Sequence, residues 1–149
     1  MTREFSAGGI VFQRSKQQKA KSQQLLWLLC QHSQHKGWVF PKGLIGDNIK
    51  GEKSEETAVR EVKEETGIEA RILKKLPNPA TYWYVWEGDK RFKTVYYFLM
   101  EATGGDIEDH DHEMSAVEWL PTDKVGERLS YKSDKIAFKE ALKLVASIK

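Results

Sequence analysis

Residues 54–68 have the sequence SEETAVREVKEETGI, and the interpretation of the whole chain starts from this stretch. Ser54 suits the N-cap of a helix, and the two glutamates that follow it place negative charge in the first turn, where the helix dipole favours it. Gly67 is of the residue type that commonly ends a helix. Ala58 and Val62 lie about one turn apart and form an apolar face that can dock on a sheet. The sequence therefore predicts a helix that begins at Ser54 and ends just before Gly67.

Three acidic side chains share another face of this predicted helix. Glu61, Glu64 and Glu65 are separated by steps of three and four residues, which bring their carboxylates together. Like charges at this spacing each destabilise a helix by about 0.2–0.5 kcal/mol, so the arrangement favours a bound cation. Oxygen ligands at this density suit Mg²⁺ or Mn²⁺. The alternative is a solvated surface helix in which Arg60 pairs with Glu56 or Glu64.

The residues before the helix extend the pattern into a longer motif. Phe40-Pro41-Lys42-Gly43 leads into a glycine-containing loop and then to Gly51-Glu52. The chain matches the Nudix hydrolase signature G-x5-E-x7-R-E-U-x-E-E-x-G-U, with U apolar, at every fixed position: Gly46, Glu52, Arg60, Glu61, Val62, Glu64, Glu65, Gly67 and Ile68. It therefore resembles the Nudix hydrolase family.

The spacing of the motif departs from the family in one respect. Many members place the glycine of Pro-Lys-Gly five residues before the first glutamate, whereas Gly43 lies eight residues before Glu52. A three-residue insertion in the loop accounts for this difference, with Gly46 matching by coincidence. Either glycine could supply the carbonyl that faces the metal, and we favour Gly43 because it directly follows a predicted strand and its proline.

The resemblance implies a fold and a chemistry. The expected fold class is α/β, a Nudix-type α/β/α sandwich with a mixed β-sheet between helices. Family members cleave a diphosphate linked to another group, commonly a nucleoside. Water attacks phosphorus, and divalent cations neutralise the phosphates and lower the pKa of a bound water. The expected cofactor is Mg²⁺ or Mn²⁺, and the expected substrate is a nucleoside polyphosphate.

The resemblance also assigns roles to the motif residues. Glu61, Glu64 and Glu65 become metal ligands together with Gly43, and one of these acids or another nearby takes the proton from water. Arg60 orients the glutamates by salt bridges, so that Arg60, Glu61 and Glu64 form the expected catalytic set. The first motif glutamate, Glu52, is expected to brace the loop or Arg60 rather than to bind metal.

Outside the motif, Glu113 is the candidate for a further metal ligand or for the base. It ends the acidic sequence His110-Asp111-His112-Glu113. Many family members use a further glutamate outside the motif, which is why this one is singled out. A solvated acidic loop and a separate His-x-His zinc site are the alternatives for this segment.

Two lysines and three tyrosines are the expected substrate contacts: Lys42, Lys93, Tyr82, Tyr84 and Tyr131. Lys42 lies just before the favoured glycine, and a lysine at a strand start, as Lys93 is, can hold a distal phosphate. Tyr82 and Tyr84 share one face of a predicted strand, which suits nucleobase stacking. Core packing of the tyrosines and a solvated position for Lys93 remain the alternatives.

Within the family, the chain resembles the diadenosine tetraphosphate (Ap4A) hydrolase branch, which splits Ap4A into ATP and AMP. The resemblance rests on Pro-Lys-Gly, the strand KTVYYFL and the late His-Glu and Glu-Trp-Leu sequences. A pyrophosphohydrolase of nucleoside triphosphates, oxidised ones included, or of RNA 5′ ends is the alternative enzyme. A non-catalytic nucleotide or RNA sensor, or a structural domain with a solvated acidic helix, are alternatives of another class. The complete set of motif carboxylates favours an enzyme over a sensor.

The rest of the chain predicts one domain, residues 1–149, with strands interleaved among helices. Strands are expected at 5–12, 24–31, 38–41, 68–76, 80–86, 92–100 and 116–120, a loop at 42–53, a turn at 87–90, and a terminal helix with an apolar stripe of Phe138, Ala141, Leu142 and Val145. Residues 13–24 are expected to form a polar loop; a basic nucleic-acid arm is the less favoured interpretation.

Composition narrows the classes of protein further. The 24 Lys and Arg against 22 Asp and Glu give a net charge of +2, which argues against an obligate nucleic-acid binder. Residues 5–46 carry six bases and no acid, and 94–123 carry eight acids and no base, a polarity that suits an anionic substrate held through cations. The single cysteine, Cys30, excludes an internal disulfide and is expected in the core. We expect a cytoplasmic monomer or homodimer without membrane contact and without a stable nucleic-acid complex.

Overall fold

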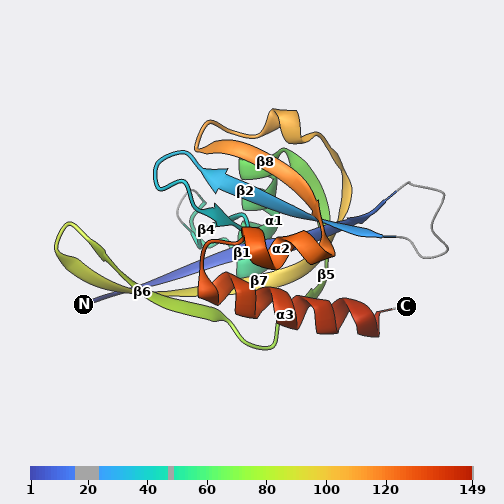
Figure 1. The fold of residues 1–149 in the computed structure, drawn as a ribbon. Coiled ribbons are helices and arrows are strands. Elements are labelled where there is room, and N and C mark those ends of the chain that lie inside the picture. Colours follow the sequence, from blue (N-terminus) through green and yellow to red (C-terminus); the bar gives the residue numbers. More distant parts are fainter. Residues whose placement is uncertain (16–23, 47–48, 149) are drawn as a thin grey trace.

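The computed structural model describes residues 1–15, 24–46 and 49–148. Within them the chain forms one eight-stranded sheet with helices packed on it (Figure 1). The strands are β1 (Thr2–Arg14), β2 (Leu25–His32), β3 (Trp38–Val39), β4 (Lys42–Leu44), β5 (Ile68–Lys75), β6 (Ala80–Trp86), β7 (Asp89–Gly105) and β8 (Met114–Pro121). The helices are α1 (Ser54–Thr66), α2 (Thr122–Arg128) and α3 (Lys132–Ser147), with a 3-10 turn at Ile107–Asp109.

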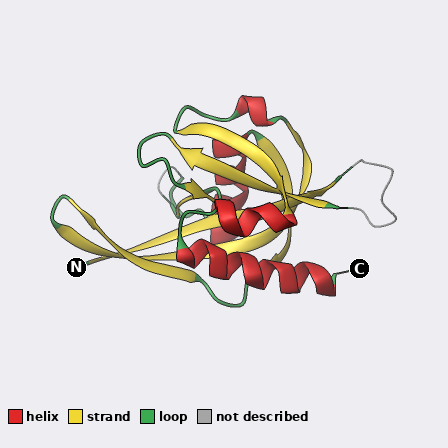
Figure 2. Ribbon diagram, in the orientation of Figure 1, coloured by secondary structure: helices red, strands yellow, loops and turns green. Residues whose placement is uncertain are grey.

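The centre of the sheet is the parallel pair β1 and β7, in register from Thr2 opposite Arg91 to Phe12 opposite Glu101. The other strand pairs are antiparallel: β2 and β4 join β1, β5 and β6 join β7, and β3 and β8 join β2. The sheet is therefore mixed and lies between helices (Figure 2), which confirms the expected α/β sandwich.

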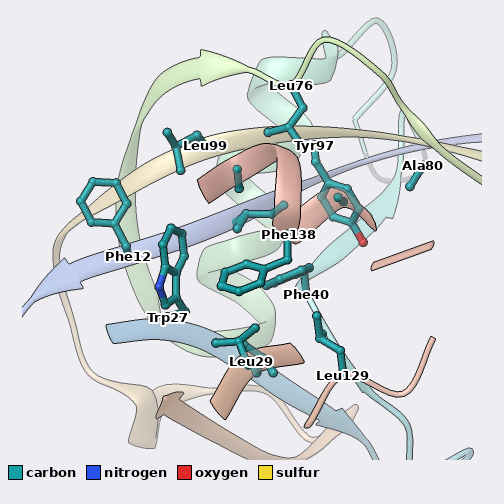
Figure 3. Close-up of a cluster of buried hydrophobic side chains, with 14 of the residues drawn as sticks. Phe12, Trp27, Leu29, Phe40, Leu76, Ala80, Tyr97, Leu99, Leu129 and Phe138 are labelled. Carbon is teal, nitrogen blue, oxygen red and sulfur yellow. The ribbon is translucent and has the colours of Figure 1, made fainter. Parts of the chain in front are cut away.

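Two apolar clusters fill the two faces of the sheet. On one face, α1 packs through Ala58 and Val62, both fully buried, against Val11, Phe98 and neighbouring side chains. On the other face, α2 and α3 enclose a larger cluster (Figure 3), whose labelled members are Phe12, Trp27, Leu29, Phe40, Leu76, Ala80, Tyr97, Leu99, Leu129 and Phe138. These two cores fix α1 and the cavity-forming strands to the same rigid sheet.

One glycine of β1 explains how closely α1 approaches the sheet. A Cβ added to Gly9 would lie 2.7 Å from Val62 Cγ2 and 2.8 Å from Met100 Sδ. Any larger residue would force the helix outward, because side chains in cores leave no spare space. The glycine pair in the first predicted strand therefore sets the depth at which the acidic helix sits.

The helix differs from the prediction at its start. Lys53, not Ser54, is the N-cap: its N–H donates to Glu56 Oε1 at 3.3 Å, and its carbonyl accepts from Thr57 N at 2.9 Å. Ser54 is the first helical residue and donates to the neighbouring Glu55. The C-terminal stop is as expected, because Gly67 adopts the left-handed conformation, with φ of 80°.

Two further elements differ from the sequence prediction. Lys42–Leu44, expected in a loop, forms β4 because it pairs with Ser6–Gly8 of β1, a long-range contact that local sequence does not reveal. The short helix α2 was not predicted. The predicted loop at 13–24 lies largely outside the described residues.

No helix among the residues that the structure describes has the length and apolar character required to cross a bilayer.

Candidate active site

Arg60 lies at the centre of an ion-pair network on α1. Its Nε and Nη2 donate to the two carboxylate oxygens of Glu52, each at 2.8 Å. Thr57 Oγ1 donates to the same carboxylate at 2.7 Å. The third donor, Nη1, reaches Glu61 at 2.9 Å and Glu64 at 3.1 Å. Arg60 therefore ties the loop before the helix to two of the three clustered glutamates, through the bidentate geometry that a guanidinium favours.

This network predicts an acid-dependent loss of stability. The hydrogen bonds from Arg60, aided by Thr57, lower the pKa of Glu52 from 4.5 to about 2. Folding therefore releases a proton from Glu52 at mildly acidic pH, so its contribution is complete above about pH 4.5 and is lost as pH falls toward 2. A Glu52→Gln variant, less stable at neutral pH, should lose less stability than the parent across that window. Urea unfolding measured in steps of pH tests this, and parallel curves for the two proteins would contradict it.

Glu61 lies directly against Gly43 of β4. A Cβ added to Gly43 would be 2.2 Å from Glu61 Cδ, so no residue other than glycine fits without moving the carboxylate. Burial raises the pKa of Glu61, Arg60 opposes this, and repulsion from Glu64 and Glu113 adds to it. Gly46, the alternative glycine of the motif, lies in a turn with φ of 75°, where the nearest described atom to an added Cβ would be Ile49 O at 4.0 Å. The structure thus places Gly43, and not Gly46, beside the glutamate cluster.

Glu65 is the most buried of the three glutamates, with 5% of its surface exposed. Its Oε2 accepts from the backbone N–H of Lys42 at 3.0 Å. Burial raises its pKa well above the ordinary value, although Lys42 opposes this effect, and repulsion from Glu61 adds to it. A carboxylate this deep, beside a second carboxylate, is costly unless positive charge comes close.

Glu64 is the exposed member of the cluster, and the acidic segment before β8 lies over it. Its backbone carbonyl accepts from Asp111 N at 3.1 Å. The same segment brings Asp111 close enough to raise the pKa of Glu65, and Glu113 close enough to raise that of Glu61. The acidic segment expected to supply an additional carboxylate therefore packs beside the helix.

The donor set fits a hard divalent cation. Carboxylate oxygens and backbone carbonyls are the ligand types that Mg²⁺ and Mn²⁺ prefer. Because Gly43 has no side chain, it leaves room for the Glu61 carboxylate beside it. Among the described residues, no three His, Cys, Asp or Glu side chains are already close enough together to hold a metal ion. His110 and His112 therefore do not form a zinc site with a third such side chain in this arrangement. Arg60 holds Glu61 and Glu64 toward itself, so binding an ion requires these side chains to turn.

A cavity of about 870 Å³ opens beside the cluster. Eight of the predicted metal and substrate residues line it: Lys42, Gly43, Glu65, Tyr82, Tyr84, Lys93, Glu113 and Tyr131. Arg60, Glu61 and Glu64 are not part of its wall, but Glu61 lies directly behind Gly43, which is. The volume is typical of a site for a nucleotide-sized ligand.

Lys42 and Lys93 are the predicted lysines of the cavity, and Lys132 also lines its wall. Burial alone would lower the pKa of Lys42, but the surrounding Asp134, Tyr82 and Glu65 outweigh it and raise the value. Burial lowers the pKa of Lys93, and repulsion from Lys42 adds to the effect. An anionic ligand between the two lysines would relieve this repulsion.

The three predicted tyrosines are placed differently within the cavity. Tyr82 is half-buried and packs against the core of the α3 face. Tyr84 lines the wall, but its hydroxyl donates to Glu4, and Arg91 donates to the same carboxylate at 3.2 Å, so this phenol is held by the fold. Tyr131 is 45% exposed. Of the three tyrosines, Tyr131 is therefore the most accessible for stacking, and Trp83 and Trp86 of the same wall are also exposed.

Sequence reasoning missed several residues of the cavity. His32 and His35 stack with ring centroids 4.2 Å apart, and the Tyr131 ring meets His35 edge-on, its hydroxyl 3.2 Å from Nδ1. Asp134 lies on the buried stripe of α3, accepts from Tyr97 at 2.8 Å and lines the same cavity. An acid three and four residues before the apolar positions Ala137 and Phe138 was the signal that could have revealed it.

The chain belongs to the Nudix family, because the family model described as NUDIX domain matches residues 3–142. The asymmetrical bis(5′-nucleosyl)-tetraphosphatase of Rattus norvegicus is 31% identical over 147 residues, which cover 95% of this chain and 95% of that protein. A Mycobacterium tuberculosis protein named MutT4 is 41% identical over 98 residues, but these are 66% of this chain and 38% of that protein.

Solved structures agree on the fold. The Caenorhabditis elegans Ap4A hydrolase in a binary complex superimposes with a TM-score of 0.75, covering 97% of this chain and 99% of that chain at 22% identity. The chain therefore has the fold of solved Nudix-family structures.

Proposed function

We propose that this chain hydrolyses Ap4A to ATP and AMP with a divalent metal ion. The supporting observation is the cavity, in which Lys42 and Lys93 lie among aromatic rings and directly beside the buried Glu65. Stacking rings suit a nucleobase, and paired lysines suit a chain of phosphates. The rat tetraphosphatase, aligned along 95% of both chains, also favours this substrate.

The residues divide the work of the reaction between them. Glu61, Glu64 and Glu65 would hold the metal ion, with the carbonyl of Gly43 facing it. When bound, the ion neutralises the phosphates and lowers the pKa of a bound water. Lys42 and Lys93 hold the phosphate chain, and Tyr131 stacks on a base. Arg60 holds the glutamate-bearing helix and the loop before it together through its three donors, and Glu61 and Glu64 would turn away from it when an ion binds. An acid beside the cluster, Glu61 or Glu113, takes the proton of the attacking water.

A second candidate is a pyrophosphohydrolase of nucleoside triphosphates, oxidised ones included. The observation in its favour is the higher identity, 41%, to MutT4, named as a mutator protein. That match leaves out a third of this chain and most of the relative, so the tetraphosphatase remains the first proposal.

A substrate panel separates the two candidates. With Mg²⁺ present, Ap4A is expected to give ATP and AMP in equal amounts and to have the highest kcat/KM of the panel. The panel includes 8-oxo-dGTP, GTP and a triphosphorylated RNA. Running the reaction in ¹⁸O-labelled water identifies which product carries the new oxygen. Release of pyrophosphate from a mononucleotide, with a higher kcat/KM than for Ap4A, would replace the first proposal with the second.

A further inference from the structure

Besides the cavity, the chain has an exposed aromatic surface on the α1 side of the sheet, where β1, β6 and β7 extend beyond the helices (Figure 1). Four aromatic side chains on these strands form it: Phe5, Trp83, Phe92 and Tyr96. We call this surface the aromatic sheet face. Phe5 is 47% and Trp83 51% exposed, which is unusual for large aromatic side chains in the middle of strands. The described helices leave these two rings in contact with solvent.

The strand register explains why these side chains share one face. Trp83 lies opposite Phe92, and Phe92 lies opposite Arg3, so one row crosses three adjacent strands. In the next row, Thr94 lies between Phe5 and Thr81. Paired residues project to the same side of a sheet. The Trp83 and Phe92 ring centroids lie 4.7 Å apart with their planes tilted by 52°, so the two rings are in contact on this face.

Positive charge accompanies the rings. Lys90 Nζ lies 4.6 Å from the centre of the Trp83 ring, and Lys75 Nζ lies 4.6 Å from that of Tyr96. Arg3 is exposed beside Phe92. None of these three cations has an ion-pair partner among the described residues. They are therefore available to a ligand that carries negative charge.

We propose that the aromatic sheet face binds single-stranded nucleic acid. Two exposed rings, Phe5 and Trp83, with half-buried rings on the strand between them and cations beside them, match the chemistry of single strands, whose bases stack on side-chain rings while their phosphates contact lysine and arginine. A second copy of this chain is a poorer occupant. A two-fold interface would bring the same cations of both copies together, and like charges disfavour that contact.

The proposal is compatible with the small net charge of the chain. Non-specific binding depends on the few cations that meet phosphates, not on the total charge. Three cations imply weak, salt-sensitive binding, with a Kd of about 1–100 µM at physiological salt. Trp83 also forms part of the cavity wall at β6, so the test has to keep the cavity filled.

Fluorescence anisotropy with a labelled single-stranded dodecamer tests the proposal. The oligonucleotide has 5′-hydroxyl ends, EDTA prevents hydrolysis, and saturating AMP occupies the cavity. Trp83→Ala should weaken binding at least about fivefold, since one base–ring stack is lost. Trp83→Phe, which keeps a ring, should retain most of the affinity. Lys90→Gln should reduce the slope of log Kd against log salt by about 0.7.

Trp86→Ala is the matched control. Trp86 is 55% exposed on the same hairpin and, like Trp83, lines the cavity, but it pairs with Asp89 and faces the other side of the sheet, so it controls for changes in the cavity. It should change the Kd by less than about twofold. Several results would overturn the proposal: no binding by the parent protein, equal losses for Trp83→Ala and Trp86→Ala, or equally tight, Trp83-dependent binding of an acidic peptide. Sedimentation showing a dimer that Trp83→Ala dissociates would assign the surface to a second copy instead.

Discussion

Glu64→Gln is expected to abolish most of the hydrolytic turnover and to leave the fold intact. If Glu64 holds the metal ion, its loss removes several kcal/mol of transition-state stabilisation, which corresponds to a fall of about 10²–10³ in kcat. The structural cost is small, because the side chain is 45% exposed and makes one 3.1 Å ion pair with Arg60. An i,i+4 pair of this kind contributes about 0.3–0.5 kcal/mol.

Glu55→Gln is the control for this variant. Glu55 is also an exposed glutamate of α1, but it lies in the first turn and bonds to Ser54. Turnover of Glu55→Gln should stay within about twofold of the parent. Turnover by Glu64→Gln equal to that of the parent would show that the site assignment is wrong. If instead the parent binds nucleotides and Mn²⁺ without turnover, the chain is a sensor on a Nudix fold.

The sequence was most informative where function restricts the residues at fixed spacing. The helix at 54–66, its glutamates and its terminal Gly67 were all predicted, because capping, charge spacing and the motif agree there. The predicted substrate residues lie far apart in the sequence, from Lys42 to Tyr131, yet line one cavity. Only the resemblance to a family could suggest that they meet, since no local pattern encodes a contact across the sheet.

The features that sequence reasoning missed depend on long-range contacts. Lys42–Leu44 carries no strong strand signal and becomes β4 through pairing with β1. The stacked His32 and His35 are brought to the cavity by a turn whose geometry, with Lys36 at φ of 63°, is not evident from composition. Net charge could not single out the aromatic sheet face, because it averages over the whole chain and does not show that Lys75 and Lys90 lie beside aromatic rings.

Arg60→Ala is expected to cause the largest loss of stability. Arg60 supplies two hydrogen bonds and the only ion pair of the Glu52 carboxylate among the described residues, Thr57 donating a third hydrogen bond, and it also neutralises Glu61 and Glu64; the Glu52 side chain is 3% exposed. Removing one partner of such a buried pair costs about 3–5 kcal/mol, because a charge is left without compensation. For a domain of this size that loss lowers Tm by about 6–20 °C. Arg71→Ala, which breaks an exposed pair with Glu101, should cost less than about 1 kcal/mol.

Metal ions should partly rescue the Arg60→Ala variant, which provides a test of the metal site that does not depend on activity. Without the guanidinium, Glu61 and Glu64 are free to turn toward an ion, and the repulsion among the carboxylates is no longer offset. Mg²⁺ should therefore raise the Tm of Arg60→Ala by more than it raises that of the parent, because an ion that binds the folded state stabilises it. Arg60→Lys should fall between the two, since a single ammonium cannot reproduce the fork that holds Glu52. Equal Mg²⁺ shifts in all three proteins would mean that the glutamates of α1 do not bind the ion, and that the network around Arg60 serves the fold alone.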